Sequence, residues 1–416
     1  MRSLGGFGVV LAAGAAGLAL TACGTAANQA GTPHPASSTQ AVSHAHSAAR
    51  ASTEALAAPQ PAATGATAPT PTATIAPVPS PSPSAPAPAR YGNPSGSATV
   101  PAAGRAVSTR HPNHVIGSGS PASCTSAAVV RAVAKGGIIT FNCGPKPVTI
   151  TMTATAKVVN THHRTVLDGG GKVTLSGGGK IRILYMNTCD PKQIYTTSDC
   201  WEQKWPQLVV QNIAFTDAYS SVRQTSTSAY GGGAIFDEGG QLKVVNSGFF
   251  SNRCYATGPD LGGAAIRALG MWPGRPVYVT SDTFRGGRCS NGGALSSIDA
   301  SWDVFNSLMS ENKTTGNGEN PAASGTPGGG SGGAIYTDGD SYSVTIAGTV
   351  IHYNDAHGGE GGAVFFVVDA GAGRLLIEEH SALHHNPSGG YVNAPGIFDD
   401  VDQKVVQPTI IDSTDN

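Results

Sequence analysis

A short glycine-rich motif recurs along the second half of the chain and restricts its fold more than any other feature. Successive copies lie 30, 30, 40 and 29 residues apart, so one unit carries about ten extra residues. A unit of this length cannot bury a core alone and is typical of repeats that stack into a solenoid. Each copy reads Gly-Gly-Ala before an apolar residue, with one more alanine in the second, and the copies begin at Gly232, Gly262, Gly292, Gly332 and Gly361.

Most of these units share a second landmark, an apolar residue three positions before an asparagine. The pairs are Phe249 with Asn252, Met309 with Asn312, Ile351 with Asn354, and Leu383 with Asn386. One unit departs from the pattern, because Gly287 follows Phe284 there. Asparagines at equivalent turns can bond to the backbone and to one another. We therefore interpret them as a structural ladder and not as a functional site.

The residues before the repeats predict one short helix and several short strands. Thr125-Ser126 can cap a helix over 127–134, which Gly136-Gly137 would end. Apolar and β-branched runs between glycine clusters indicate strands at 138–141, 148–151, 165–167 and 173–175. The sequence therefore predicts an all-β chain whose open end is covered by the helix.

These motifs resemble those of a known group of surface proteins. The Gly-Gly-Ala-Ile and Phe-x-x-Asn repeats are similar to those of polymorphic outer membrane proteins, within the right-handed parallel β-helix, pectate-lyase-like superfamily. The resemblance covers residues 138 to about 400. It implies a right-handed parallel β-helix. It is less specific for function, because the superfamily includes adhesins, polysaccharide lyases and glycosidases.

The first 22 residues have the composition of a bacterial export signal. A short apolar stretch ends in Leu20-Thr21-Ala22-Cys23, which resembles a lipobox. That resemblance implies a lipid on Cys23 and a chain anchored at the bacterial cell envelope, exposed on the surface or outside the cell. The alternative is an ordinary secretory signal in which Cys23 is incidental. Both interpretations place the mature chain outside the cytoplasm.

Residues 23–120 are rich in alanine, proline, serine and threonine and contain very few large apolar side chains. Such a segment cannot compensate the entropy lost on ordering, so we expect a disordered stalk. About 100 residues of random coil would span roughly 55 Å, and the prolines would extend them further. The stalk is either a bare spacer or a glycan-bearing segment. The folded domain is expected over 121–416.

Six cysteines follow Cys23, and an even number in an exported chain predicts disulfides. Cys254 and Cys289 each lie five residues after an equivalent phenylalanine, so we pair them across adjacent units. We further expect Cys124 to bond Cys143 and Cys189 to bond Cys200, which would fix the helix and close a short loop.

Basic residues provide the most distinctive candidate site. Arg253, Arg288 and Lys313 each follow the asparagine position of their unit and would stack as a column, which Arg285 can widen. Such a column is either solvated and paired with acids, or it binds an extended polyanion such as a uronate-containing polysaccharide. The net charge of −1 predicts no general attraction to nucleic acid.

A long loop over 187–207 carries Tyr195, Trp201 and Trp205 around the Cys189–Cys200 pair. Loops that interrupt a repeat often carry function. The two tryptophans are therefore candidates for stacking on sugar rings or anchoring a protein, although they can equally pack the loop onto the first units.

Other polar groups give weaker signals. The pair Asp399-Asp400 superficially matches a glycosidase motif, and His352 and His384 would lie near each other with His385, His357 and His380 close by. We expect neither a metal site nor a cofactor. Five acidic residues that follow the Gly-Gly-Ala turns are interpreted as exposed turn residues, with calcium binding as the alternative: Asp237, Glu238, Asp299, Asp338 and Asp340.

Together these features predict a surface or secreted protein that binds a polysaccharide or another cell-envelope partner, as an adhesin does. The alternative is a polysaccharide lyase or glycoside hydrolase acting on an acidic glycan through the basic column. The sequence favours binding, since no catalytic group of residues stands out from the repeats.

Overall fold

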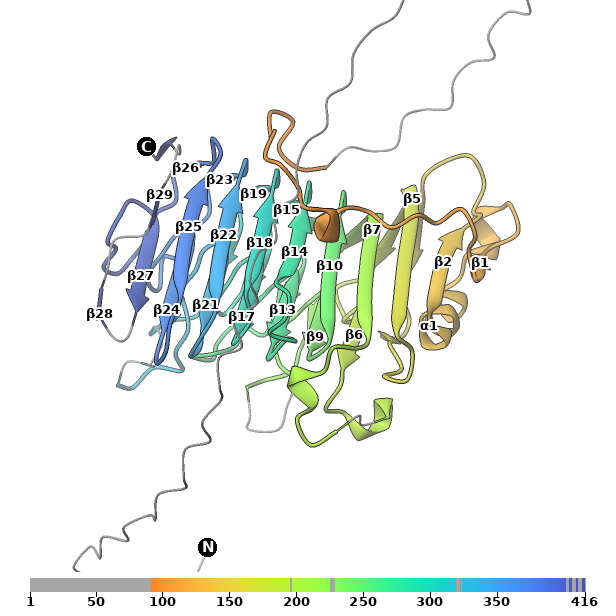
Figure 1. Ribbon diagram of the computed structural model, residues 1–416, viewed down its shortest axis with the longest axis horizontal. Helices are drawn as coiled ribbons and strands as arrows, with labels where there is room; N and C mark the ends of the chain where they lie inside the picture. The colour runs from red at the N-terminus through yellow and green to blue at the C-terminus, as the bar shows by residue number, and fades with distance from the viewer. Residues whose placement is uncertain are drawn as a thin grey trace, which may run out of the picture. The chain divides into compact units, whose positions relative to one another are not determined.

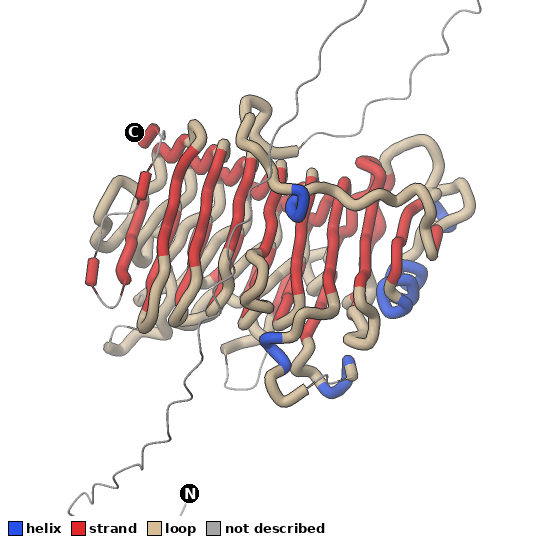
Figure 2. Tube along the Cα trace, viewed as in Figure 1, coloured by secondary structure: helices blue, strands red, loops and turns tan. Residues whose placement is uncertain are grey.

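The computed structural model describes residues 91–416 except 195–196, 225–228, 319–321, 323, 402–403, 406–408, 411–413 and 416. The leader, Cys23, Tyr195 and most of the expected stalk therefore lie outside the described residues. In the described part the chain is mostly strand (Figure 1, Figure 2), which confirms the all-β class. Its helices are α1 (Ser126–Lys135) and the short 3-10 helices η1 (Ala102–Gly104), η2 (Pro121–Ser123), η3 (Pro191–Gln193) and η4 (Cys200–Glu202).

The largest sheet, sheet A, has 17 strands, and all of its pairings are parallel. Its strands are β1 (His114–Ile116), β2 (Gly137–Phe141), β3 (Val148–Thr151), β5 (Arg164–Ser176), β7 (Gln207–Thr216), β10 (Gln241–Val245), β11 (Gly248–Phe250), β14 (Val277–Thr280), β15 (Thr283–Arg285), β18 (Trp302–Phe305), β19 (Leu308–Ser310), β22 (Ser343–Ala347), β23 (Val350–His352), β25 (Arg374–Glu378), β26 (Ala382–His384), β29 (Thr409–Ile410) and β30 (Thr414–Asp415).

Two smaller sheets accompany sheet A, and the smaller of them, sheet C, extends over only four units. Sheet B contains β4 (Ala156–Lys157), β6 (Leu184–Asn187), β9 (Ile235–Glu238), β13 (Ile266–Leu269), β17 (Leu295–Ile298), β21 (Ile335–Asp338), β24 (Val364–Val368), β27 (Ile397–Val401) and β28 (Lys404–Val405), of which only β28 pairs antiparallel. Sheet C contains β8 (Tyr219–Ser220), β12 (Arg253–Cys254), β16 (Arg288–Cys289) and β20 (Lys313–Thr314).

The glycine-rich motif marks the entry into sheet B. In all five units, a glycine lies three residues before the first residue of the sheet B strand, and its φ is between 53° and 75°. A Cβ atom there would collide with the carbonyl oxygen of the residue three positions on. Glycine is required because it adopts this backbone without strain. The apolar residue that follows is buried in every unit: Ile235, Ile266, Leu295, Ile335 and Val364.

Equivalent apolar residues stack between the sheets to form the core. The rings of Phe215, Phe249 and Phe284 lie parallel, with centroids 5.0 and 4.8 Å apart. Met309 and Ile351 continue this row in register. Burying each such side chain contributes about 1.5–3 kcal/mol, so the repeated row stabilises every pair of neighbouring units.

The asparagine ladder is confirmed. Asn312 Nδ2 donates to Asn354 Oδ1 at 2.8 Å, and Asn354 Nδ2 donates to Asn386 Oδ1 at 3.0 Å. In the unit without an asparagine, the backbone N–H of Gly287 donates to Asn312 Oδ1 at 2.9 Å. A side chain at Gly287 would collide with the carbonyl oxygen of Gly293, so close packing explains the departure from the pattern.

All three predicted disulfides are present. Cys124–Cys143, Cys189–Cys200 and Cys254–Cys289 have Cα separations of 5.7, 5.1 and 4.7 Å. The predicted helix is also present as α1, where the Thr125 hydroxyl accepts from the N–H of Ala128 and Gly136 follows with φ 66°. Helix and disulfide together cover the N-terminal end of the core.

Residues 91–113 form a strap along sheet A, although the sequence analysis places the start of the folded domain at residue 121 (Figure 1). Asn306 and Ala98 exchange two hydrogen bonds of 2.8 and 2.9 Å, and Gln211 and Val107 exchange two more of 2.9 and 2.8 Å. The strap is held through its backbone by amide side chains of the sheet. Because these contacts place no demand on the strap's own side chains, its composition resembles that of the stalk. The composition therefore does not mark the start of the folded domain.

The ladder yields a stability prediction. Substitution Asn354→Ala removes the bonds to Asn312 and Asn386 and leaves the carbonyl of Met309 without its 3.1 Å donor. Because these groups are buried, we expect the free energy of unfolding to fall by about 2 kcal/mol or more in urea titrations. The exposed Asn317→Ala serves as the control, and equal stabilities of the two variants would contradict the ladder's role.

Candidate functional site

The predicted basic column is formed by sheet C. Arg253 in β12 pairs with Arg288 in β16, which pairs with Lys313 in β20. Tyr219 in β8 precedes them in the same row. The column arises because parallel strands place equivalent residues of successive units side by side, about 4.8 Å apart.

The members of the column differ in their partners. Lys313 Nζ lies 2.7 Å from Asp355 Oδ2, and Arg285, which lies outside the column, forms an exposed ion pair of 2.5 Å with Glu311. Arg253 and Arg288 are exposed, and neither forms an ion pair with any residue that the structure describes. Arg253 instead lies over the ring of Tyr219, 5.6 Å from its centroid. Two adjacent guanidinium groups without an acid repel each other, which favours binding of an anion.

A disulfide holds this part of the column. Cys254 and Cys289 directly follow Arg253 and Arg288, are nearly inaccessible to solvent, and bond across β12 and β16. Because side chains alternate along a strand, the cysteines face inward while the arginines face solvent. The disulfide fixes the spacing of the two arginine backbones.

Along the chain, the tryptophan loop comes directly after a strand of sheet B, β6, whereas each residue of the basic column comes before the sheet B strand of its unit. The loop and the column therefore lie at opposite borders of sheet B. The fold therefore does not bring these two predicted sites together. Trp201 is 52% exposed, and Trp205 is half-buried and stacks on His163 at 5.2 Å. Lys204 Nζ lies 5.5 Å from the ring centre of Trp205 and 5.2 Å from that of Trp272, a residue that the sequence analysis did not select. Trp205 thus packs the loop, and Trp201 remains available for a ligand.

The outer side of sheet B carries a row of aromatic and charged residues that the sequence analysis missed. Tyr185 stacks on Phe236 at 5.5 Å, and Tyr336 stacks on Phe365 at 4.9 Å. Arg267 lies between these pairs and is fully buried. The sequence contained a signal for four of these residues, because each is the second residue of its strand after the Gly-Gly-Ala turn: Phe236, Arg267, Tyr336 and Phe365.

Arg267 and its neighbours form a buried polar cluster. Its Nη1 donates to the hydroxyl of Ser296, while Nε and Nη2 have no hydrogen-bond partner among the described residues. The guanidinium lies 5.5 Å from the ring centre of Tyr230. Burial lowers the pKa of Arg267. Burial also raises the pKa of Asp338 to about 6, although the hydroxyl of Tyr336 donates to its Oδ2 at 2.9 Å. Asp338 can therefore release or accept a proton near neutral pH.

The structure corrects the interpretation of several acidic residues as exposed turn residues. Asp237 is completely buried in β9, and Asp338 is 8% exposed in β21, whereas Asp299 and Asp340 are exposed. In the described part of the chain, both carboxylate oxygens of Asp237 lack a hydrogen-bond partner, and burial raises the pKa of Asp237 well above the usual value. The error arose because Asp237 occupies an inward position that is apolar or small in the neighbouring strands.

The Asp399-Asp400 pair does not form a joint site. The two residues are consecutive in β27 and therefore point to opposite faces of sheet B. Asp399 is 2% exposed, and burial raises its pKa to about 7.

The predicted histidine neighbours do meet. The rings of His352 and His384 are 5.0 Å apart, and the Nδ1 atoms of His384 and His385 are 3.0 Å apart. Burial lowers the pKa of His352 and His384. Among the described residues, no three histidine, cysteine or acidic side chains are placed to hold a metal ion.

The chain matches no known protein family, and no curated protein or solved structure is significantly similar to it. In the part of the chain that the structure describes, none of the helices has the length and apolar character needed to cross a bilayer.

The buried Asp237 predicts a pH dependence of stability. Its folded pKa is raised above the unfolded value of about 3.9, so its neutral form stabilises the fold at low pH and this contribution is lost as pH rises through the folded pKa. We expect Asp237→Asn to raise the melting temperature at pH 8 and to change it little at pH 4. Asp340→Asn at an exposed position is the control, and identical pH profiles for wild type and Asp237→Asn would contradict this assignment.

Proposed function

We propose that the three sheets form the walls of a right-handed parallel β-helix and that the chain is a binding protein. This architecture is supported by the strands that follow the glycine motif, because they pair in register in sheet B in five successive units. The lipobox-like sequence at Cys23 and the stalk further suggest display at the bacterial cell envelope, exposed on the surface or outside the cell. The partner would then be a polysaccharide or a component of another cell.

The proposed ligand is an extended anionic polysaccharide, and the observation that carries this proposal is the Arg253–Arg288 pair. The two guanidinium groups lie in register, exposed and without an acidic partner among the described residues. A uronate polymer along the column would offer one carboxylate to each arginine through paired hydrogen bonds. Lys313 would contribute less because Asp355 already neutralises it.

The local structure favours such binding. The Cys254–Cys289 disulfide fixes the spacing between the two strands, so little backbone entropy is lost when a ligand bridges them. The ring of Tyr219 beside Arg253 adds a surface on which a sugar can stack. Trp201 is a separate aromatic contact at the opposite border of sheet B. No cofactor is required for this function.

The column yields a binding prediction. In Arg253→Ala/Arg288→Ala, two charge-assisted contacts are lost, so we expect affinity for polygalacturonate to weaken by about 2 kcal/mol, roughly 30-fold, in calorimetry. Binding by the wild type should also weaken as salt is added, because the contacts are exposed. The exposed Arg275→Ala is the control, and equal affinities of the double variant and the wild type would reject the column as the site.

A glycoside hydrolase is the second candidate, and the pKa of about 6 at Asp338 favours it. In the outer row of sheet B, Asp338 and Asp400 stand two strands apart, so their backbones are about 9.6 Å apart. This spacing is close to the upper limit of the carboxyl separation in an inverting pair. Asp338 would donate the proton and Asp400 would activate water. The substrate would lie across sheet B and not along the basic column.

Product analysis separates the two functions. After incubation of neutral and uronic polysaccharides with the protein, mass spectrometry would detect oligosaccharides only from an enzyme. If the chain is a hydrolase, Asp338→Asn should lower product formation by about 100-fold or more while polygalacturonate binding to the column persists. The matched control is Asp340→Asn. Intact polymers across the panel would reject the hydrolase.

A further inference from the structure

The charges of this chain are separated along its length, although the net charge is only −1. Residues 114–189, which exclude the strap, contain eight lysines and arginines and a single acidic residue, Asp168. Residues 335–416 contain twelve acidic residues and only two basic ones, Arg374 and Lys404. The two ends of the folded part therefore carry large charges of opposite sign.

The parallel sheets convert this separation in sequence into a separation in space. Strand β1 and helix α1 lie at one end of the described body, and β27 and β29 lie at the other (Figure 1). From β1 to β29 the pairing order of sheet A crosses nine strand spacings, or roughly 43 Å. Because the Debye length at physiological salt is about 8 Å, the two ends do not neutralise each other.

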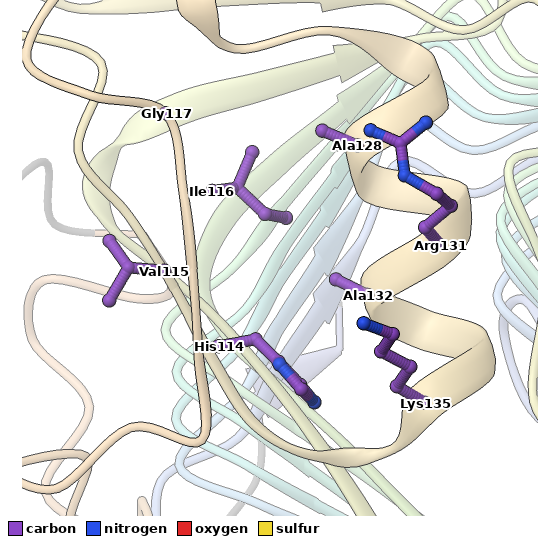
Figure 3. A pocket seen from close by; sticks show the side chains of 8 residues that line it. All are labelled: His114, Val115, Ile116, Gly117, Ala128, Arg131, Ala132 and Lys135. Atoms are coloured by element: carbon purple, nitrogen blue, oxygen red, sulfur yellow. The ribbon is translucent and has the colours of Figure 1, made fainter.

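The basic end contains a pocket beside the helix that covers the core. A cavity of about 190 Å³ lies between β1 and α1. Figure 3 shows the side chains that line it, of which Ile116, Ala128 and Ala132 form its apolar part. Its other lining residues are His114, Val115, Gly117, Arg131 and Lys135, so no acidic side chain lines it.

The two basic side chains beside this pocket form no ion pair within the described part of the chain. Arg131 and Lys135 lie one helical turn apart, are exposed, and form no ion pair with the residues that the structure describes. Strand β1 pairs only with β2 in the described sheet, and its Val115 is 54% exposed. This end therefore combines an uncovered strand edge, an apolar pocket and unpaired positive charge.

The acidic end carries carboxylates that lie close to one another. Burial raises the pKa of Asp400, and the nearby Asp369 raises it further. Burial likewise raises the pKa of Asp369, with additional contributions from Asp340 and Asp299. Arg374 forms no ion pair with any described residue. Asp299 and Asp340 follow β17 and β21 of earlier units, so these carboxylates form a row that extends to the acidic end, and none of them has an ion pair with a described residue.

We propose that copies of this chain associate head to tail, with the basic end around β1 and α1 docked onto the acidic end of the next copy. A second copy is the occupant favoured here because the chain itself carries the complementary surface at its other end. Such a contact joins two different surfaces and leaves one of each free, so it generates open chains of copies. This contact is separate from the proposed polysaccharide column on sheet C.

The test is the salt dependence of assembly of the full-length chain in analytical ultracentrifugation. At about 10 mM salt the Debye length is about 30 Å, and the weight-average mass should rise about twofold or more with protein concentration. At about 1 M salt the Debye length falls to about 3 Å, and the protein should sediment as a monomer. A monomer at all concentrations in low salt would overturn the proposal.

Charge reversal identifies the surfaces. Arg131→Glu/Lys135→Glu should remain monomeric in low salt, as should Asp369→Lys/Asp400→Lys. A mixture of the two variants should associate again, because each then supplies the charge that the other lacks; such recovery also excludes misfolding of either variant. Lys192→Glu/Arg275→Glu, exposed in middle units, is the control and should assemble as wild type. Unchanged assembly of either end variant, or no recovery on mixing, would overturn the proposal.

Discussion

Parallel backbone pairing between successive repeat units is the constraint on which the rest of this structure depends. Each strand bonds to the equivalent strand of the units before and after it, about 4.8 Å away. Every position in the repeat is therefore placed beside its own copies. A side chain is compatible with the fold only if it packs well against, or bonds to, the equivalent side chains of the two neighbouring units.

Different residue types meet this constraint in different ways. Phenylalanines stack into a continuous apolar row, and asparagines satisfy one another because an amide both donates and accepts. Arginine side chains can only donate hydrogen bonds, so Arg253 and Arg288 cannot bond to each other. Their guanidinium groups depend on solvent or on an external anion as acceptor. This difference explains why one repeated polar row is structural and another is the best candidate for binding.

Much of the fold and part of the candidate site could be predicted from repeat spacing. The Cys254–Cys289 disulfide and the Arg253–Arg288–Lys313 column both followed from equivalent positions in successive units. The strap at 91–113 could not be predicted, because backbone groups bound to Gln211 and Asn306 hold it and its own side chains carry no such signal. Asp237 was interpreted as an exposed turn residue because it is polar, whereas its inward strand position requires burial. Arg267, in the outer row, was not selected at all.

The sequence by itself determined the repeat length, the strand class, the disulfide pairs and the residues that share a row. These properties depend on spacing along the chain, which parallel pairing carries directly into space. Only the tertiary structure decided which rows are buried, which charges lack partners, and that Trp201 lies at the opposite border of sheet B from the basic column. Those properties depend on which loops and which neighbouring side chains cover each face, and distant segments of the chain supply both.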